Sequence, residues 1–243
     1  MTQYKTLNLM TYQIFIDSID MLDFSQKLVI NTLNPHSYIL AKQDPLFYEA
    51  LHQSNVLLSD GSGIVLAAKL IKKRDIHKIA GADLHEYLLH ELNARKGKCF
   101  YLGAREPTLK KIKERIGREY PDIIVETYSP PYRRAFSEED SKIMISKINR
   151  VQPDILFIGM TAPKQEKWVH MHKEFLNVNT ICSIGAVFDF YAGTVERPSE
   201  FWIDHHLEWL PRLFSDPVRL WKRTFISAPL FVWDILLYKF KNI

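Results

Sequence analysis

Short apolar runs alternate with longer helical patterns over residues 20–190, and this alternation limits the fold more than any other feature of the sequence. Continuous apolar strands separated by helices of roughly 10–15 residues are typical of βαβ units, whose parallel sheet is buried on both faces. Right-handed crossovers between such units give a doubly wound, Rossmann-like α/β domain with a mostly parallel sheet. Ligands of such sheets bind beyond the carboxyl ends of the strands, so we expect the site at that edge.

The predicted elements follow the hydrophobic spacing and the capping signals. The spacing predicts strands over residues 36–41, 56–59, 98–103, 123–128, 154–159 and 180–185. It predicts helices over residues 20–33, 44–53, 62–73, 82–95, 107–120, 138–151 and 163–175. Ser137 is expected to cap the helix at 138–151, because Asp140 at its third position completes a capping-box pattern.

The composition excludes several classes of protein. With 47% hydrophobic and 25% charged residues over 243 positions, the chain differs from disordered, collagen-like and coiled-coil sequences. Cys99 and Cys182 each lie in an apolar run, which favours buried, reduced thiols over a disulfide framework. No apolar run reaches the roughly 18 residues of a membrane span, and residues 1–10 lack the apolar core of a signal peptide. We therefore expect a protein on the cytosolic side.

The last 42 residues differ in kind from the rest, since they hold four of the five tryptophans. Between Arg212 and Lys241 there are six basic residues against two acidic ones, and two helical pieces divided at Pro229 are expected. Basic residues mixed with Trp and Phe are typical of a helix lying in the interface of an anionic membrane, although a helix that docks on a partner subunit would look similar. The sequence thus predicts a core over residues 1–197 and an appendage over 198–243, in which residues 201–243 contact the membrane. The net charge of +4 is too small to indicate nucleic acid binding.

Two junctions between a strand and a helix carry candidate chemistry. Asp60 follows the apolar run 56–59, so its carboxylate can face a ligand as a general base, or it can simply cap the next helix. Residues 159–166 join another strand to a helix that starts near Pro163, and the free amides of such a terminus can bind an anion. Lys164 and Gln165 would stand beside that anion.

The remaining candidates are glycines and one more acid. Gly103, Gly159 and Gly185 end three predicted strands, where a glycine lets a ligand approach or simply makes a turn. Asp189 follows the last strand and could contact a ribose or a sugar, or close a turn. The sequence contains no Asp-x-Asp triplet, P-loop or GxGxxG, and no histidine spacing typical of a metal site, so we expect no metal.

Several motifs match one family in order and spacing over about residues 30–223. The matching segments are 31–34, 59–63, 80–84, 101–104, 153–154, 159, 163–166, 185–189, 192–193, 197–198 and 207–212. On these segments the chain resembles the WecG/TagA/CpsF glycosyltransferases (glycosyltransferase family 26), bacterial enzymes of lipid-linked surface polysaccharide assembly. Pro-Lys-Gln-Glu at 163–166 and Glu-Trp-Leu-Pro-Arg at 208–212 are the most specific of them.

The resemblance implies an inverting, metal-independent and cofactor-free transfer of a sugar from a UDP-linked donor. The acceptor would be a saccharide on polyprenyl diphosphate, at the inner face of the bacterial cell membrane, and the donor sugar ManNAc, its uronic acid or glucose. Asp60 matches the proposed general base of the family, and Thr32, Asn34 and Gln165 match residues that line the pocket. The expected substrate-binding residues are Lys78, Gly81, Gly103, Gly159, Pro163, Lys164, Gly185, Asp189, Arg212, Arg219, Lys222 and Arg223. The last four would close over the site and neutralise the leaving diphosphate.

Two departures from the family pattern concern the donor. Lys78 stands where the family usually has an arginine, which keeps the charge but loses the planar fork, and Pro211 stands where a tyrosine is common. A nucleotide-binding hydrolase or phosphotransfer enzyme on the same fold is the main alternative, and a non-catalytic nucleic-acid or membrane-binding module is the second. The oligomeric state stays open.

Overall fold

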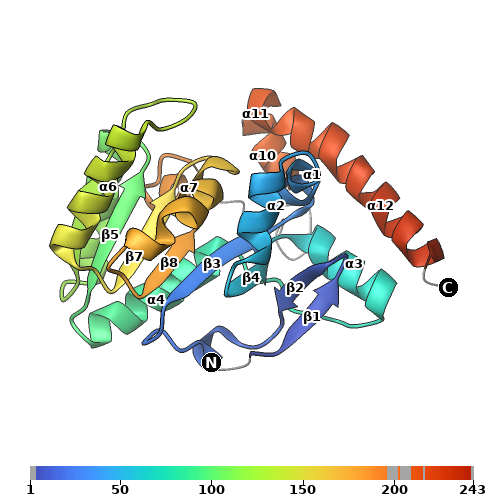
Figure 1. Cartoon of the computed structure of the whole chain (residues 1–243), viewed down its shortest axis with the longest axis horizontal. Coiled ribbons are helices and arrows are strands. Elements are labelled where there is room, and N and C mark those ends of the chain that lie inside the picture. Colours follow the sequence, from blue (N-terminus) through green and yellow to red (C-terminus); the bar gives the residue numbers. More distant parts are fainter. Residues whose placement is uncertain (1–3, 196–201, 203–208, 216, 242–243) are drawn as a thin grey trace.

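A six-stranded parallel sheet forms the centre of the computed structural model, with helices on both of its faces (Figure 1). The model describes residues 4–195, 202, 209–215 and 217–241. In spatial order the strands are β4 (Val56–Ser59), β3 (Leu28–Leu33), β8 (Thr180–Ser183), β7 (Ile155–Gly159), β5 (Lys98–Gly103) and β6 (Ile124–Tyr128). This arrangement confirms the predicted doubly wound α/β fold.

The helices over the core part of the chain mostly follow the predicted spacing. They are α1 (Pro35–Ala41), α2 (Pro45–His52), α3 (Ser62–Lys72), α4 (Gly81–Ala94), α5 (Glu106–Glu119), α6 (Glu138–Val151), α7 (Lys164–His172) and α8 (Val187–Tyr191). The capping box of α6 is confirmed, because Ser137 Oγ accepts from the Asp140 N–H (3.1 Å) and Asp140 Oδ2 accepts from the Ser137 N–H (3.0 Å). The predicted helix over 163–175 is shorter, since α7 gives way to a 3-10 turn at Lys173–Phe175.

The predictions of a helix over 20–33 and a strand over 36–41 are wrong. Residues Leu28–Leu33 form β3, which is paired in parallel with β4 on one side and β8 on the other. Its position inside the sheet buries both faces, so its apolar residues run without the alternation of a half-exposed strand. Pro35–Ala41 is helical because Asn34 caps its N-terminus and Pro35 occupies the first helical position.

A two-stranded antiparallel hairpin, β1 (Thr6–Leu9) and β2 (Tyr12–Phe15), was not predicted. It packs against β4 at the edge of the main sheet (Figure 1). Its turn residues, Met10 and Thr11, both adopt positive φ values of 51° and 78°.

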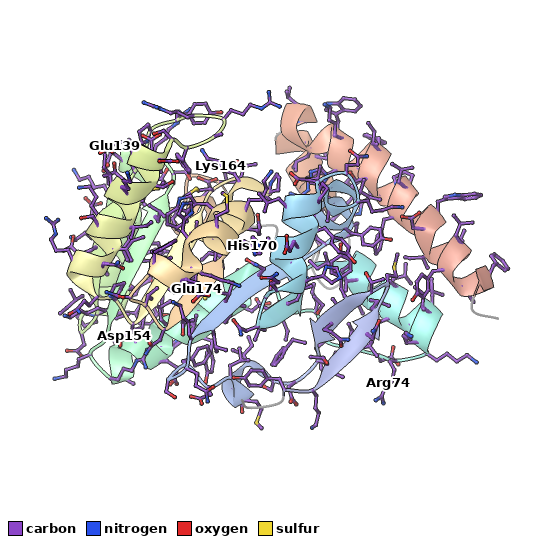
Figure 2. The ribbon with its side chains drawn as sticks, in the orientation of Figure 1. Arg74, Glu139, Asp154, Lys164, His170 and Glu174 are labelled. Carbon is purple, nitrogen blue, oxygen red and sulfur yellow. The ribbon has the colours of Figure 1, made fainter. Side chains whose placement is uncertain are left out.

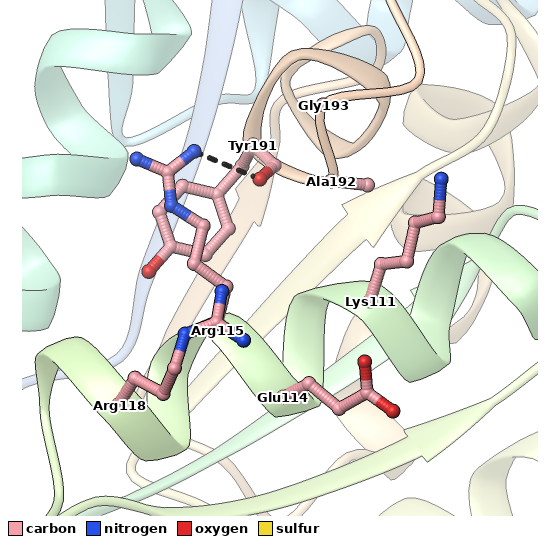
Figure 3. A pocket seen from close by; sticks show the side chains of 7 residues that line it. All are labelled: Lys111, Glu114, Arg115, Arg118, Tyr191, Ala192 and Gly193. Carbon is pink, nitrogen blue, oxygen red and sulfur yellow. Dashed lines mark hydrogen bonds between the residues drawn. The ribbon is translucent and has the colours of Figure 1, made fainter.

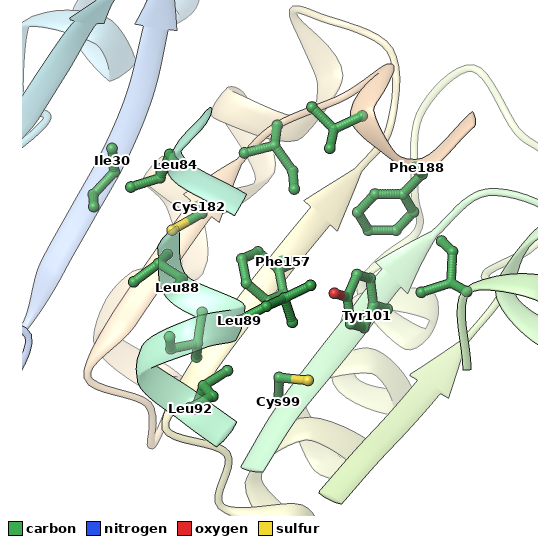
Figure 4. Close-up of a cluster of buried hydrophobic side chains, with 14 of the residues drawn as sticks. Ile30, Leu84, Leu88, Leu89, Leu92, Cys99, Tyr101, Phe157, Cys182 and Phe188 are labelled. Carbon is green, nitrogen blue, oxygen red and sulfur yellow. The ribbon is translucent and has the colours of Figure 1, made fainter. Parts of the chain in front are cut away.

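The core lies on both faces of the sheet. On one face α4 and α5 cover apolar side chains of the strands. Figure 4 shows Leu88 and Leu89 of α4 over Tyr101 of β5 and Phe157 of β7. On the other face α6 and α7 pack against β5, β7 and β8, and Trp168 of α7 is fully buried there. Cys99 and Cys182 are free, buried thiols, as predicted.

The C-terminal segment folds onto the core near α1 and α3. It contains α10 (Trp209–Ser215), α11 (Pro217–Lys222), a π-helical turn at Arg223–Ser227, and α12 (Ala228–Lys241). Phe231 and Ile235 on α12 are buried against α1 and α3. In the described part of the chain, no helix has both the length and the apolar character needed to cross a bilayer.

Candidate functional site

Two polar side chains from neighbouring strands meet at the carboxyl edge of the sheet. Asn34 follows β3 and Asp60 follows β4, and Asn34 Nδ2 donates a hydrogen bond to Asp60 Oδ2 (3.3 Å). The orientation of the amide is fixed by helix capping, because Asn34 Oδ1 accepts from the backbone N–H groups of His36 (3.1 Å) and Ser37 (3.0 Å). The remaining amide group of Asn34 therefore points at the carboxylate. This pair places a half-buried carboxylate where it can accept a proton from a ligand.

The segment that precedes α4 carries Lys78 along the end of β4. Ser59 Oγ donates to the His77 carbonyl (2.7 Å), and the Ile79 N–H donates to the Ser59 carbonyl (3.0 Å). These bonds fix the half-buried Lys78 next to the end of β4. Thr32 lies within β3, two residues before Asn34 and opposite Leu58 in the register, and is half-buried.

Gln165 joins the edge from α7, between the ends of β7 and β8. Its side-chain oxygen accepts from the Met160 N–H (3.1 Å), and its amide nitrogen donates to Glu166 Oε1 (2.8 Å). A Cβ added to Gly185, just past β8, would lie 3.6 Å from both of these Gln165 atoms, so the amide lies near this glycine with room for a methyl group between them. Gly185 therefore leaves the edge open beside Gln165.

Gly103 and Gly159 have another role. A Cβ on Gly103 would lie 2.5 Å from the Gly159 carbonyl oxygen, and one on Gly159 would lie 2.3 Å from the Phe188 ring. At these two positions, the group that needs the space left by the missing side chain is thus another part of the protein and not a ligand. Gly81 opens α4 with Ile184 and Val187 against it, which packs the start of this helix on the residues that flank Gly185.

Lys164 is engaged by the loop that precedes α6. Its Nζ donates to the Arg133 carbonyl (2.6 Å) and lies 3.7 Å from the centre of the Phe136 ring. Burial lowers the pKa of Lys164. Figure 2 shows Lys164 at the start of α7, next to this loop. Pro163 is the N-cap residue of α7, one position earlier than expected. The loop contacts account for a lysine at this helix terminus without an anion.

Asp189 closes a turn. Its backbone carbonyl accepts from the N–H groups of Thr194 (3.0 Å) and Val195 (3.3 Å), and Thr194 Oγ1 lies 3.5 Å from Asp189 Oδ1. The main chain of Asp189 thus closes a turn, and the ligand contact expected of its carboxylate stays a prediction.

The C-terminal segment reaches the site through α1. His36 Nδ1 lies 2.8 Å from Ser227 Oγ, and the pKa of His36 is lowered to about 4, first by burial and second by the charge of Arg223. Arg223 is therefore near the start of α1, the helix that Asn34 caps. Lys222 Nζ lies 5.8 Å from the centre of the Trp221 ring. Arg212 and Arg219 are on α10 and α11, and their side chains lie outside the described part of the chain.

Sequence reasoning gave no role to three residues that the structure ties to this edge. They are His36, Ser227 and Glu166. Only Glu166 carried a signal, because it belongs to the Pro-Lys-Gln-Glu segment. Within the described residues, no group of three or more His, Cys, Asp or Glu side chains could hold a metal.

A separate pocket lies between the second half of α5 and the end of α8 (Figure 3). None of the residues expected to form the site lines it. Arg115 is already bound there, to Glu119 Oε1 (2.7 Å) and to the Tyr191 carbonyl (3.0 Å). The pocket therefore adds nothing to the edge described above.

Comparison with known proteins gives a consistent result. A family model described as the Glycosyl transferase WecG/TagA/CpsF family matches residues 4–243. An N-acetylglucosaminyldiphosphoundecaprenol N-acetyl-beta-D-mannosaminyltransferase of Bacillus subtilis (strain 168) is 33% identical over 224 residues, which cover 91% of this chain and 85% of the relative. Proteins of the same name from Bacillus spizizenii (32% identity; 90% and 82% covered) and Staphylococcus aureus strain MW2 (26% identity; 89% and 83% covered) are also similar.

Proposed function

The chain belongs to the WecG/TagA/CpsF family of glycosyltransferases, and on that premise we propose that it transfers a sugar from a UDP-linked donor to GlcNAc on undecaprenyl diphosphate. The acceptor follows the names of the relatives, and the same names favour ManNAc as the sugar over its uronic acid or glucose. The observation that carries the proposal is the Asn34–Asp60 hydrogen bond at the carboxyl edge of the sheet.

The proposed reaction is a single displacement without a metal. Asp60 takes the proton of the acceptor hydroxyl while that oxygen bonds to the anomeric carbon, and the bond from this carbon to the diphosphate oxygen breaks on the opposite face. The configuration is therefore inverted, and UDP leaves with the bonding electron pair. The Asn34 amide holds the carboxylate in place. Cations of the appendage, Arg212, Arg219 and Lys222 or Arg223, stabilise the charge that develops on the diphosphate.

The appendage is proposed to lie on an anionic membrane surface, at the inner face of the cell membrane. On α12 the residues that face away from the core are apolar and exposed: Leu230, Val232, Trp233, Leu236, Leu237 and Phe240. The opposite side of the helix is buried, so α12 is apolar on both sides. A helix of this kind needs a second apolar contact besides the core. Membrane lipid next to Lys239 and the basic residues of α11 meets that need.

The division into a catalytic core over 1–197 and an appendage over 198–243 belongs to the same proposal. Deletion of the appendage should leave a folded core with little transfer activity, since the leaving diphosphate loses its cations. A truncated protein with full turnover would refute this role.

The reaction is tested by UDP release from a panel of UDP-sugars in EDTA, with and without a short-chain polyprenyl-diphosphate-GlcNAc acceptor. The matched pair is Asp60→Asn and Asp75→Asn, because Asp75 is an exposed carboxylate that pairs with Lys69 on α3. The proposal expects acceptor-dependent release that survives EDTA, falls at least about 100-fold in Asp60→Asn and persists in Asp75→Asn. The product should have the inverted anomeric configuration by NMR. Release without acceptor, or only with a metal, would instead support a nucleotide hydrolase.

A further inference from the structure

Glu166 is a buried acid at the edge of the site, directly after Gln165 on α7. Only 3% of the residue is exposed. A carboxylate in such a place is unfavourable unless it is paired or hydrogen-bonded. The groups that hydrogen-bond or pair with the Glu166 carboxyl therefore matter.

Nearby cations do not compensate this acid. Lys167, the next residue, donates to Asp44 Oδ2 (2.7 Å) at the N-terminus of α2. His170 lies one turn further on the flank that faces α2 (Figure 2), and its Nε2 is 4.0 Å from Glu49 Oε2. Glu166 Oε2 finds no hydrogen-bond partner among the residues that the structure describes. The side-chain contact of Glu166 is thus its Oε1 bond to Gln165.

That bond fixes the Gln165 amide from one side, and the backbone fixes it from the other. Gln165 Oε1 accepts from the Met160 N–H, and Gln165 Nε2 donates to Glu166 Oε1. Both contacts demand the same orientation of the amide, with its oxygen toward β7. An amide carries two N–H groups, so one N–H remains after the bond to Glu166. The amide lies near Gly185, with room for a methyl group between them, so this N–H is close to the residues that follow β8.

We propose that Glu166 is a positioning residue, whose carboxyl orients the Gln165 amide so that its second N–H faces the ligand between the ends of β7 and β8. Glu166 itself does not touch the substrate. The inference rests on the proposed function, with Gln165 as one of the residues expected to line the pocket.

Four variants test this role: Glu166→Gln, Glu166→Leu, Gln165→Leu and the double variant Gln165→Leu/Glu166→Leu. Glu166→Leu removes the acceptor and should lower kcat/KM roughly 10- to 100-fold. Glu166→Gln keeps a carbonyl oxygen for the Gln165 N–H and should restore activity to within about threefold of the wild type. The double variant should be no worse than Gln165→Leu, because Glu166 acts through that amide. Val169→Ala, a buried change on the same helix, controls for lost stability and should leave kcat/KM unchanged.

A second readout does not depend on activity. The Gln165 side-chain amide can be assigned in 15N–1H spectra as the signal that Gln165→Leu removes. Its hydrogen exchange should be slow in the wild type and in Glu166→Gln, and fast in Glu166→Leu. Unchanged exchange in Glu166→Leu, or additive losses of kcat/KM in the double variant, would overturn the inference. An inactive wild type with the expected exchange pattern would refute the proposed function and leave the positioning role in place.

Discussion

Protonation of His36 should loosen the contact between the appendage and the core. His36 lies on α1 with its Nδ1 2.8 Å from Ser227 Oγ, and its pKa is lowered to about 4 by burial and by the charge of Arg223. When the appendage leaves α1, the imidazole should regain its ordinary pKa of about 6.5. Because the pKa is depressed in the docked state, docking is fully stable above pH 6.5 and loses stability as the pH falls toward 4.

The size of the effect follows from the two pKa values. Between pH 7.5 and pH 5 the docked state should lose about 1–2 kcal/mol, which is roughly a 5- to 30-fold increase in the opening equilibrium. The upper value of about 2 kcal/mol is the limit set by the two pKa values, and solvent at the partly exposed ring lowers it. Hydrogen exchange of the α12 amides, corrected for the intrinsic pH dependence of exchange, measures this change. The α6 amides serve as an internal reference, since α6 lies at the opposite end of the molecule from α12 (Figure 1).

The matched variant is His36→Gln, which can still bond Ser227 but does not titrate. Its α12 amides should open equally at pH 7.5 and pH 5, within about threefold. The reasoning fails if the wild type shows no change over this range. It also fails if His36→Gln shows the same loss, because another group would then be responsible.

Three further predictions concern single side chains. Burial raises the pKa of Glu166 from 4.5 to about 7. The loss of folding stability that comes from ionising this buried carboxyl is therefore absent below pH 4.5 and complete above pH 7. In urea titrations between pH 5 and pH 8, the wild type should therefore lose about 2–3 kcal/mol of unfolding free energy relative to Glu166→Gln. Gly159→Ala places a methyl group 2.3 Å from the buried Phe188 ring and should destabilise the folded protein by about 1–3 kcal/mol. Gly117→Ala on α5 meets open space and should stabilise the folded protein by about 0.5–1 kcal/mol, and thermal melts compare the two variants. Phe231→Ala should lower the unfolding free energy by about 3–5 kcal/mol, while Trp233→Ala, 60% exposed, should leave it unchanged and instead weaken co-sedimentation with anionic vesicles.

The sequence predicted the strands from residue 56 onward and the helices between residues 44 and 175 to within a few positions, because their apolar runs and caps agree, but it missed α8, and the helical division expected at Pro229 is wrong, since Pro229 lies within α12. It failed at β3 and α1, where a strand buried on both faces lost its alternation and the short helix at 35–41 looked like an apolar strand. The capping signal of Asn34 and Pro35 was present in the sequence, and in the structure these residues start a helix despite the apolar pattern that follows. The hairpin was missed for a different reason. Met10 and Thr11 adopt positive φ values although neither is Gly, Asn or Asp, so the usual turn signal is absent.

The sequence predicts the parts of the candidate site that depend only on a residue's position relative to the end of a strand. Asp60 and Gln165 each follow the end of a strand, and parallel strands bring such residues to one edge. The contacts between separate elements could not be predicted in this way. The bond from the Met160 N–H to Gln165 Oε1 depends on how α7 lies against the end of β7, and the bond between His36 and Ser227 joins residues 191 positions apart.

The appendage and the catalytic pair meet in one packing unit. A Cβ on Gly63 would lie 2.4 Å from the Pro35 ring and 3.5 Å from the Phe231 ring, so the starts of α1 and α3 meet α12 at this point. Asn34 and Asp60 stand just before those same two helix starts. Because a close-packed interior transmits displacement, a shift of α12 changes how α1 and α3 meet, and with it the hydrogen bond between the two side chains. We therefore expect the docking of the appendage to be coupled to the geometry of the proposed base, in addition to any charge that it brings to the leaving group.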